Sequence, residues 1–229
     1  TVIRFVSNGA LEGGEYLEVD NVALTNTCIG PKDNIPGGVN ADLLSGVPPT
    51  LVQAGVFLLL RLHPALSGTP EWLYLVAGAG LVTLLVGAWS AIFQHDLKGL
   101  LAYSTVSHLG LITLLIGLES PLTTVAAVFH LLNHATFKAS LFMAAGIIDH
   151  ECGTRDMRRL HGLMRHLPWT GSLAIVAAAA MAGVPLLNGF LSKEMFFAET
   201  LFIDAHRAVE WVVPAAATLA AVFSVAYSL

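Results

Sequence analysis

Long apolar runs recur through most of this chain, and they constrain its fold more than any other feature. Beyond Pro49 the runs are Thr50–Leu62, Trp72–Phe93, Leu100–Leu118, Leu122–Ile148, Trp169–Ile203 and Val209–Leu229. A helix needs about 20 apolar residues to cross a bilayer core of roughly 30 Å, so the runs predict about five to six spans. The expected fold is therefore all-α, a polytopic transmembrane helix bundle.

The composition supports a membrane protein. Hydrophobic residues make up 55% of the chain and charged residues 12%, whereas an ordinary soluble domain carries about 25% charged residues. A soluble bundle of buried helices is disfavoured, because so many apolar runs leave too few polar faces to cover them. The net charge of −5 disfavours a nucleic-acid-binding surface.

The first 45 residues differ from the rest. Residues 1–45 hold an excess of acidic side chains, six glycines and two prolines, and no long apolar run. This pattern predicts a polar, loop-rich segment with short strands, and it lacks the parts of a signal peptide. We therefore divide the chain into segment 1–45, of unknown role, and a transmembrane domain over residues 46–229.

The arginines predict how the helices cross the membrane. Arg155, Arg158, Arg159 and Arg165 lie in the loop of residues 149–168, and Arg61 alone opposes them from the other side. Short cytoplasmic loops are enriched in Lys and Arg. We therefore expect a multi-pass protein of the plasma (inner) membrane, with loop 149–168 in the cytoplasm.

One apolar run carries a row of ionisable side chains. His130, His134 and Lys138 are spaced i, i+4 and i+8, which places them on one helix face. A charge in the membrane costs roughly 2.5–3.5 kcal/mol, and such residues usually face a bundle interior or a water path. Neutral imidazole has a donor and an acceptor nitrogen, so the row could pass protons. Hydrogen-bonded contact between helices and zinc binding by the two histidines are the alternatives.

Two further places could extend this row. Gly183 and Pro185 interrupt the run Trp169–Ile203, and Lys193 follows the break. Discontinuous helices form ion sites in transporters, although the break could also be a simple loop with Lys193 at the interface. Lys98 and His108 lie before and within the run Leu100–Leu118; Lys98 could equally reach the interface, and His108 could equally join helices.

We find no sequence motif for a cofactor or a metal. The chain has no phosphate loop, no dinucleotide fingerprint and no nucleophile elbow. Four Cys and His residues in or near the basic loop match no familiar zinc spacing: His150, Cys152, His161 and His166. We therefore predict no cofactor and no bound metal.

Three stretches of the chain resemble one known family. They are residues 93–110, with the run Asp-Leu-Lys-Gly-Leu-Leu-Ala-Tyr-Ser-Thr; residues 129–146, with His-x-x-x-His-x-x-x-Lys; and residues 183–194, with the break and Lys193. Together they resemble the proton-translocating antiporter-like proteins. That group comprises the large antiporter-like subunits of respiratory complex I and the Mrp-type multisubunit Na⁺/H⁺ antiporters. Loop residues 148–163 resemble the A subunit of the Mrp type more than complex I.

The resemblance implies a fold and a set of roles. The family fold contains two inverted helical repeats, each with a broken helix, and residues 72–229 would be the second repeat. By the resemblance, Lys98, His130, His134 and Lys138 would belong to a central polar axis, and Lys193 would be the exit gate. Our own hypothesis for the path is that protons move from Lys98 or His108 through His130, His134 and Lys138 to Lys193. Since no first repeat precedes these stretches and residues 1–45 match nothing in the family, we expect a fragment or a rearranged product.

The resemblance also implies a function. We expect monovalent cation/proton antiport, performed by a secondary transporter subunit rather than an enzyme. Its partners would be the other subunits of a multisubunit complex, the lipid bilayer, protons, and Na⁺ or another monovalent cation, with no nucleic acid. The alternative within the family is a proton-pumping subunit of complex I, which would be part of a redox-driven enzyme. A structural membrane fragment, with polar residues that only join helices, is the alternative outside transport.

Overall fold

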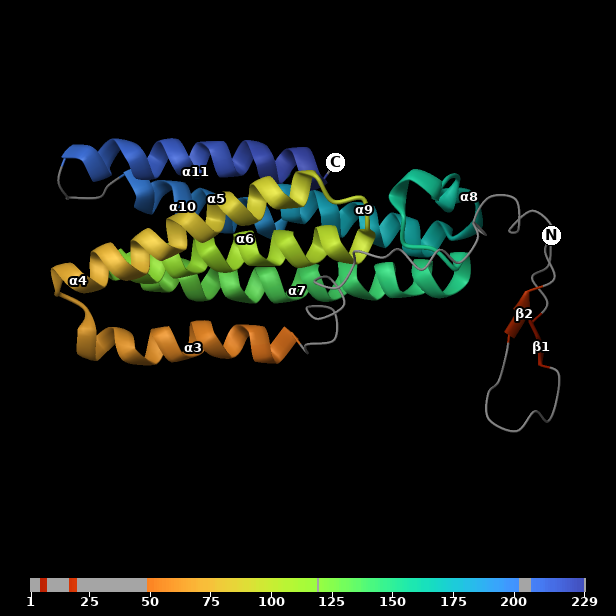
Figure 1. Cartoon of the computed structure of the whole chain (residues 1–229), viewed down its shortest axis with the longest axis horizontal. Helices are drawn as coiled ribbons and strands as arrows, with labels where there is room; N and C mark the ends of the chain where they lie inside the picture. Colours follow the sequence, from red (N-terminus) through yellow and green to blue (C-terminus); the bar gives the residue numbers. More distant parts are fainter. Residues whose placement is uncertain (1–4, 8–16, 20–48, 119, 202–206, 229) are drawn as a thin grey trace.

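The computed structural model describes residues 5–7, 17–19, 49–118, 120–201 and 207–228. Its long helices lie side by side along one common axis, as Figure 1 shows. Four helical stretches of the described part are long and apolar enough to cross a membrane. They are the continuous run of α4 (Pro70–Trp72), the π-helical turn η1 (Leu73–Ala77) and α5 (Gly78–Ile92), then α6 (Leu97–Gly117), α7 (Pro121–Cys152) and α11 (Arg207–Ser228).

These four stretches coincide with predicted apolar runs, so the transmembrane helix bundle is confirmed. Two shorter apolar helices accompany them, α3 (Pro49–Leu66) and α9 (Pro168–Ala182). The run Thr50–Leu62 thus continues as helix to Leu66, and α3 packs along α6.

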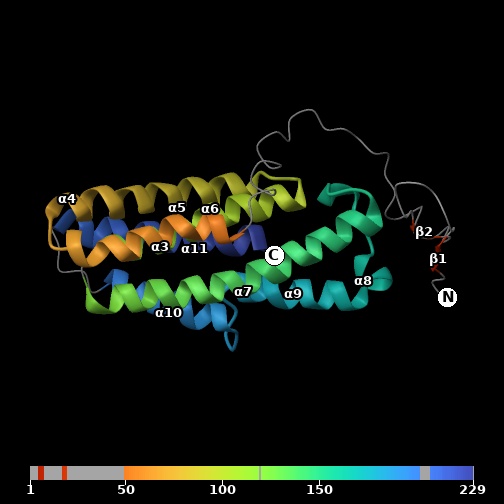
Figure 2. The same ribbon diagram turned by 90° about the horizontal axis from the view of Figure 1, so that it is seen from below.

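The predicted helix break is also present. Helix α9 ends at Ala182 and α10 (Asn188–Leu201) begins after a short non-helical segment. Figure 2 shows α9 and α10 following one another along α7. Gly183 has a φ of 88° and caps α9 in the left-handed region, and Leu186 has a φ of 77°. The backbone is therefore non-helical on both sides of Pro185, and Pro185 itself cannot donate a helical hydrogen bond.

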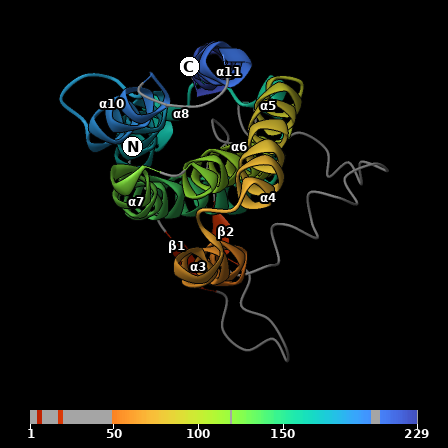
Figure 3. The same cartoon turned by 90° about the vertical axis from the view of Figure 1, so that its left-hand side faces the viewer.

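Helix α6 lies at the centre of the bundle. Viewed along the axis in Figure 3, α6 lies between α5 and α7, with α3 on one side and α10 and α11 on the other. Its side chains Ile112, Leu115 and Ile116 are fully buried. Helices α5 and α6 approach to backbone contact, because a Cβ atom on Gly80 would lie 2.4 Å from the Leu114 nitrogen. The central position of α6 places any polar side chain on it deep inside the protein.

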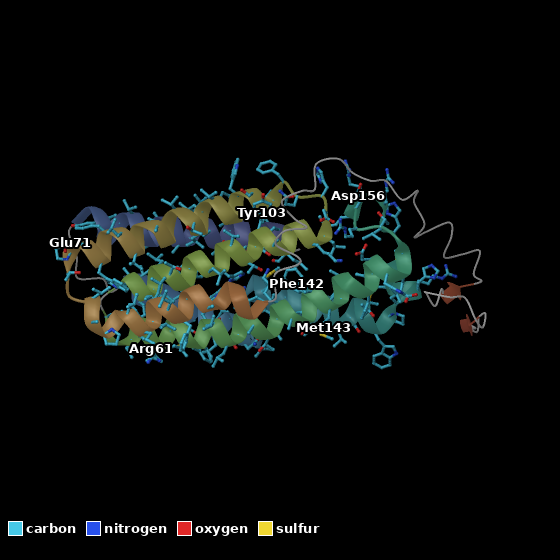
Figure 4. All side chains as sticks on the ribbon, turned by 60° about the horizontal axis from the view of Figure 1, so that its bottom comes forward. Arg61, Glu71, Tyr103, Phe142, Met143 and Asp156 are labelled. Carbon is cyan, nitrogen blue, oxygen red and sulfur yellow. The ribbon has the colours of Figure 1, made fainter. Side chains whose placement is uncertain are left out.

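The end of the bundle with the basic loop is tied together by backbone hydrogen bonds. Leu97 donates to the Arg155 carbonyl at 3.0 Å, and Met157 donates to the His95 carbonyl at 3.0 Å. This links the turn before α6 to the loop after α7, which also contains the short helices η2 (Met157–Arg159) and α8 (Leu163–His166). In Figure 4, Asp156 marks this end of the bundle, and Arg61 and Glu71 mark the opposite end.

The polar N-terminal segment contains one small antiparallel pair of strands. Strand β1 (Phe5–Ser7) pairs with β2 (Leu17–Val19), with Phe5 opposite Val19. Short strands in residues 1–45 are expected from the sequence. The boundary at residue 45 lies outside the described residues, so the division into two parts remains a prediction.

Candidate functional site

The predicted row on α7 faces the interior. His108, His130, His134 and Lys138 are each at most 4% exposed. His130, His134 and Lys138 share one face of α7 because their spacing nearly matches the helical period, and that face packs on α6. Apolar residues such as Leu132 and Met143 occupy the exposed faces of the same helix.

His108 of α6 and His130 of α7 form the centre of the site. His108 Nδ1 lies 3.0 Å from His130 Nε2, and the two rings stack with centroids 5.2 Å apart. The other nitrogen of His130 lies 3.1 Å from Ser192 Oγ on α10, and the other nitrogen of His108 lies 3.5 Å from the hydroxyl of Tyr227 on α11. Four helices thus contribute to one chain of hydrogen-bonding groups.

The hydrogen bonds of this series can all point in one direction or all in the other. If His108 Nδ1 donates to His130, then His130 donates to Ser192, which donates to the Gly189 carbonyl at 3.1 Å. If Ser192 donates instead, each bond reverses and His108 can donate to Tyr227. Each neutral imidazole carries one donor and one acceptor in either tautomer, so both directions are open to it. Reversal of such a chain moves a proton without moving a heavy atom.

His134 differs from its two neighbours on the row. It is buried, and both of its ring nitrogens lack a hydrogen-bond partner among the described residues. Its ring lies 5.4 Å from that of His108 and 5.6 Å from that of Phe137. A buried polar group without a partner costs free energy. Within the part of the chain that the structure describes, His134 therefore joins no helices through hydrogen bonds.

Lys138 reaches across to α6. Its amine donates to the Leu101 carbonyl at 3.2 Å and to Ser104 Oγ. An ammonium has three donors, so one remains for another acceptor. One alternative to transport is that the polar residues only join helices. Lys138 and His130 fit that alternative, because both are buried and hydrogen-bonded. His134 does not fit it.

Lys193 lies at the helix break, as expected. Its amine donates to the Ala182 carbonyl at 2.9 Å, which the end of α9 leaves free, and to Ser224 Oγ of α11 at 2.8 Å. A cavity of about 20 Å³ is lined by apolar side chains and by five polar residues: Ser107, His108, Lys193, Ser224 and Tyr227. A cavity needs roughly 10–15 Å³ to hold a water molecule, so one water has room between His108 and Lys193.

Lys98 lies apart from the central residues, at the loop end of the bundle. Its amine is 2.6 Å from Asp149 Oδ2 in the last turns of α7. The side chains are 24% and 31% exposed, respectively. In the described part of the chain, no carboxylate pairs with Lys138 or Lys193, so Lys98 differs from both in having a counter-charge.

The spatial order of the predicted site residues differs from the order of the predicted proton path. The sequence suggested a path through His130, His134 and Lys138 to Lys193. In the structure Lys138 packs against α6 near the loop end, while Lys193 shares a cavity with His108 and follows Ser192, the partner of His130. Lys193 is therefore next to the histidine end of the row.

Sequence reasoning missed four polar residues of this site: Asp149, Ser192, Ser224 and Tyr227. Ser224 and Tyr227 had a detectable signal, since both are polar residues within an otherwise apolar run. Asp149 lay within the basic loop, and nothing in the sequence tied it to Lys98. Over the described residues, no group of three His, Cys, Asp or Glu side chains is placed to hold a metal ion.

The fold and site together are typical of one class of protein. A bundle of transmembrane helices with one broken helix and a buried line of protonatable side chains is the architecture of ion-coupled secondary transporters. The family described as "NADH:quinone oxidoreductase/Mrp antiporter, TM" matches residues 43–224. The chain belongs to this family.

Known relatives agree with this assignment. The chain is 66% identical over 180 residues to a probable K⁺/H⁺ antiporter A/B subunit of Rhizobium meliloti, and this match covers 79% of the chain and 18% of the relative. It is 48% identical over 199 residues to a Na⁺/H⁺ antiporter A subunit of Alkalihalophilus pseudofirmus, covering 79% and 25%. The chain thus spans about a quarter or less of the length of these relatives.

A solved structure agrees as well. The Mrp complex from Dietzia sp. DQ12-45-1b contains a chain that matches with a TM-score of 0.72 and 44% identity, over 83% of this chain and 21% of that one. The resemblance to the A subunit of the Mrp-type antiporters, which the sequence motifs indicated, is confirmed. A multi-pass membrane protein, as expected, is confirmed with it.

Proposed function

We propose that this chain is the proton-conducting part of a monovalent cation/proton antiporter subunit. The observation that carries the proposal is the reversible hydrogen-bond chain through His108 and His130. The buried Lys138 and the partly buried Lys193 lie near this chain, and neither amine pairs with a carboxylate among the described residues. Buried ammonium groups without counter-charges are expensive. Such amines are suited to alternate between charged and neutral as protons pass.

The proposed path has two segments. On the loop side, protons move between Lys98 and Lys138 along the polar groups of α6, Leu101 carbonyl and Ser104. In the centre they move from Lys138 through His134 to His108 and His130, and then through Ser192 or one water to Lys193. No hydrogen bond to a described residue holds the His134 ring, which packs against the rings of His108 and Phe137.

The exchanged cation and the partners belong to the whole protein. The names of the relatives include K⁺ for one and Na⁺ for the other, so we propose a monovalent cation and leave its identity to measurement. We also propose that the chain works within a multisubunit membrane complex, because the similar chain from Dietzia is part of an Mrp complex. It would be a secondary transporter subunit, not an enzyme, since only the shared family supports the redox-driven alternative.

Replacement of Lys138 tests the proposal. In the full antiporter complex, in everted membrane vesicles, we expect Lys138→Ala and Lys193→Ala each to reduce cation-driven proton exchange to background. We expect the same of Lys138→Arg, because a guanidinium keeps the charge and does not release its proton. Exchange is measured with a pH-sensitive dye after addition of Na⁺, K⁺ or Li⁺.

The matched control is Ser140→Ala. Ser140 lies two residues from Lys138 on the exposed side of α7, and among the described residues its hydroxyl donates only to the Thr136 carbonyl. The complex with Ser140→Ala should exchange protons at the wild-type rate. Wild-type exchange in either lysine-to-alanine variant, with normal complex assembly, would refute the proposed path.

A further inference from the structure

Lys98 forms an ion pair with Asp149. Among the described residues, no other lysine of the path pairs with a carboxylate. The pair joins the first turn of α6 to the last turns of α7, with 2.6 Å between the amine and the carboxylate oxygen. The neighbouring charged groups are engaged elsewhere: Asp96 pairs with Arg155, Asp156 with Arg158, and Glu151 with His150. Asp149 is therefore the carboxylate directed at the path.

The position of the pair is the boundary between the buried row and water. Both side chains are about one quarter to one third exposed, at 24% and 31%, whereas Lys138 is 4% exposed. A carboxylate at such a boundary can exchange protons with water and contact a buried chain at the same time. An ion pair that is partly exposed is also cheap to open, unlike a fully buried one.

The surrounding backbone holds the two helices in register. The hydrogen bonds Leu97 to Arg155 and Met157 to His95, both 3.0 Å, fix the turn before α6 against the loop after α7. The Asp96 carboxylate adds a cap on the Gly99 amide at 3.1 Å and an ion pair with Arg155 at 3.4 Å. The long side chain of Lys98 can therefore move while its surroundings stay in place.

The next polar groups inward are within reach of that side chain. Leu101 follows Lys98 by three residues, about 4.5 Å along a helix. Its carbonyl and Ser104 Oγ are the acceptors that hold the amine of Lys138. An amine released from Asp149 would thus meet the loop-side end of the buried row.

We propose that Asp149 is the proton acceptor through which the path exchanges protons with water on the loop side, and that its protonation releases Lys98. This inference rests on the proposed function. Asp149 takes a proton from water and becomes neutral, which leaves the Lys98 ammonium without a counter-charge. Lys98 then gives its proton inward to a neutral Lys138 amine, and Asp149 gives its proton to Lys98. One proton has moved from water to Lys138, and the ion pair is restored.

The test uses the full antiporter complex in vesicles. We expect Asp149→Asn to lower the maximal exchange rate at least tenfold, with the cation concentration for half-maximal rate and the melting temperature of the complex little changed. Asparagine can still hydrogen-bond to Lys98 but cannot carry a proton. Asp149→Glu should keep at least a third of the rate. The control is Glu151→Gln, which removes a carboxylate on the same helix end and should exchange at the wild-type rate.

A charge swap separates proton transfer from a purely structural role. The double variant Lys98→Asp with Asp149→Lys keeps an ion pair between the two helices, so its melting temperature should stay close to that of the wild type while its exchange rate stays low. Recovery of the rate in the swap, or a wild-type rate in Asp149→Asn, would overturn the inference. Lys138→Ala, measured in parallel, identifies what failed: active Lys138→Ala refutes the path itself, and inactive Lys138→Ala with active Asp149→Asn refutes only the role of Asp149.

Discussion

At the scale of single residues, the same side-chain type has different surroundings that suit different tasks. His130 is bonded at both nitrogens and His134 at neither within the described structure. Among the carboxylates of the loop end, Asp149 faces Lys98, while Asp156 serves the loop itself. Asp156 is 6% exposed and accepts hydrogen bonds from Arg158 Nη2 at 2.8 Å and from the Arg158 amide at 3.1 Å.

These bonds make the loop sensitive to acid. The hydrogen bonds from the Arg158 side chain lower the pKa of Asp156 from 3.8 to about 2, and the same hydrogen bonds, together with the Asp156 charge, raise the pKa of Arg158. Because the folded-state pKa lies below the unfolded one, Asp156 stabilises the loop fully above about pH 4. This stabilisation is lost as the pH falls from 3.8 through about 2.

Asp156→Asn reproduces the protonated acid at neutral pH. We expect it to loosen η2 and to speed trypsin cleavage after Arg158 and Arg159 several-fold in solubilised complex, because each arginine loses its ion pair with Asp156. Gel electrophoresis of timed digests measures the rate. Glu151→Gln, whose carboxylate contacts His150 rather than this turn, should be cleaved like the wild type; equal cleavage of all three proteins would contradict the role of Asp156.

At the scale of helices, the close contact of α5 and α6 determines where the polar residues of α6 lie. A Cβ atom on Gly110 would lie 2.4 Å from the Leu84 nitrogen, and one on Gly80 equally close to the Leu114 nitrogen. Such contacts are allowed only without side chains. They bring Ser107 within hydrogen-bonding distance of the Leu84 carbonyl, at 3.0 Å, and they orient the opposite face of α6 with His108 toward α7 and α11.

Gly80→Ala tests this packing. The added methyl group overlaps the α6 backbone, which cannot move as easily as a side chain, so we expect a loss of about 1–3 kcal/mol of stability. Gly78→Ala is the matched control two residues away, since nothing lies within 4 Å of its added Cβ and alanine favours a helix. Thermal melting of the complex should fall for Gly80→Ala and stay equal or rise for Gly78→Ala. Equal melting temperatures would contradict the proposed contact.

At the scale of the whole molecule, charged ends and an apolar belt match a membrane-spanning bundle. Arg61 and Glu71 lie at one end and the basic loop at the other (Figure 4). Exposed apolar side chains such as Leu132 and Trp89 lie on the helices between them. We therefore expect the bundle axis to lie close to the membrane normal, with the arginine-rich loop in the cytoplasm.

Single cysteines test this orientation. In a background without native cysteines, we expect His150→Cys to react with an impermeant maleimide only from the cytoplasmic side and Thr69→Cys only from the opposite side. Leu132→Cys, exposed on the bundle but within the apolar belt, should react from neither. Labelling of intact cells and of everted vesicles gives the comparison. Reaction of His150→Cys in intact cells would reverse the orientation.

Three features could be predicted from the amino-acid order alone: the spans, the break at Pro185, and the row of His130, His134 and Lys138. A bilayer imposes length and polarity along one dimension, proline breaks a helix by local geometry, and a spacing of four residues places side chains on one face. These properties depend on residues close in the chain, so periodicity and composition were sufficient to find them.

Which of these groups meet depends instead on how the helices pack. The pairing of His108 with His130, the place of Lys193 beside His108, and the ion pair of Lys98 with Asp149 join residues far apart in the chain. Each depends on how far two helices are rotated and how closely they approach. That geometry results from the packing of all the helices together, including the glycine contacts of α5 and α6, and local sequence does not contain it.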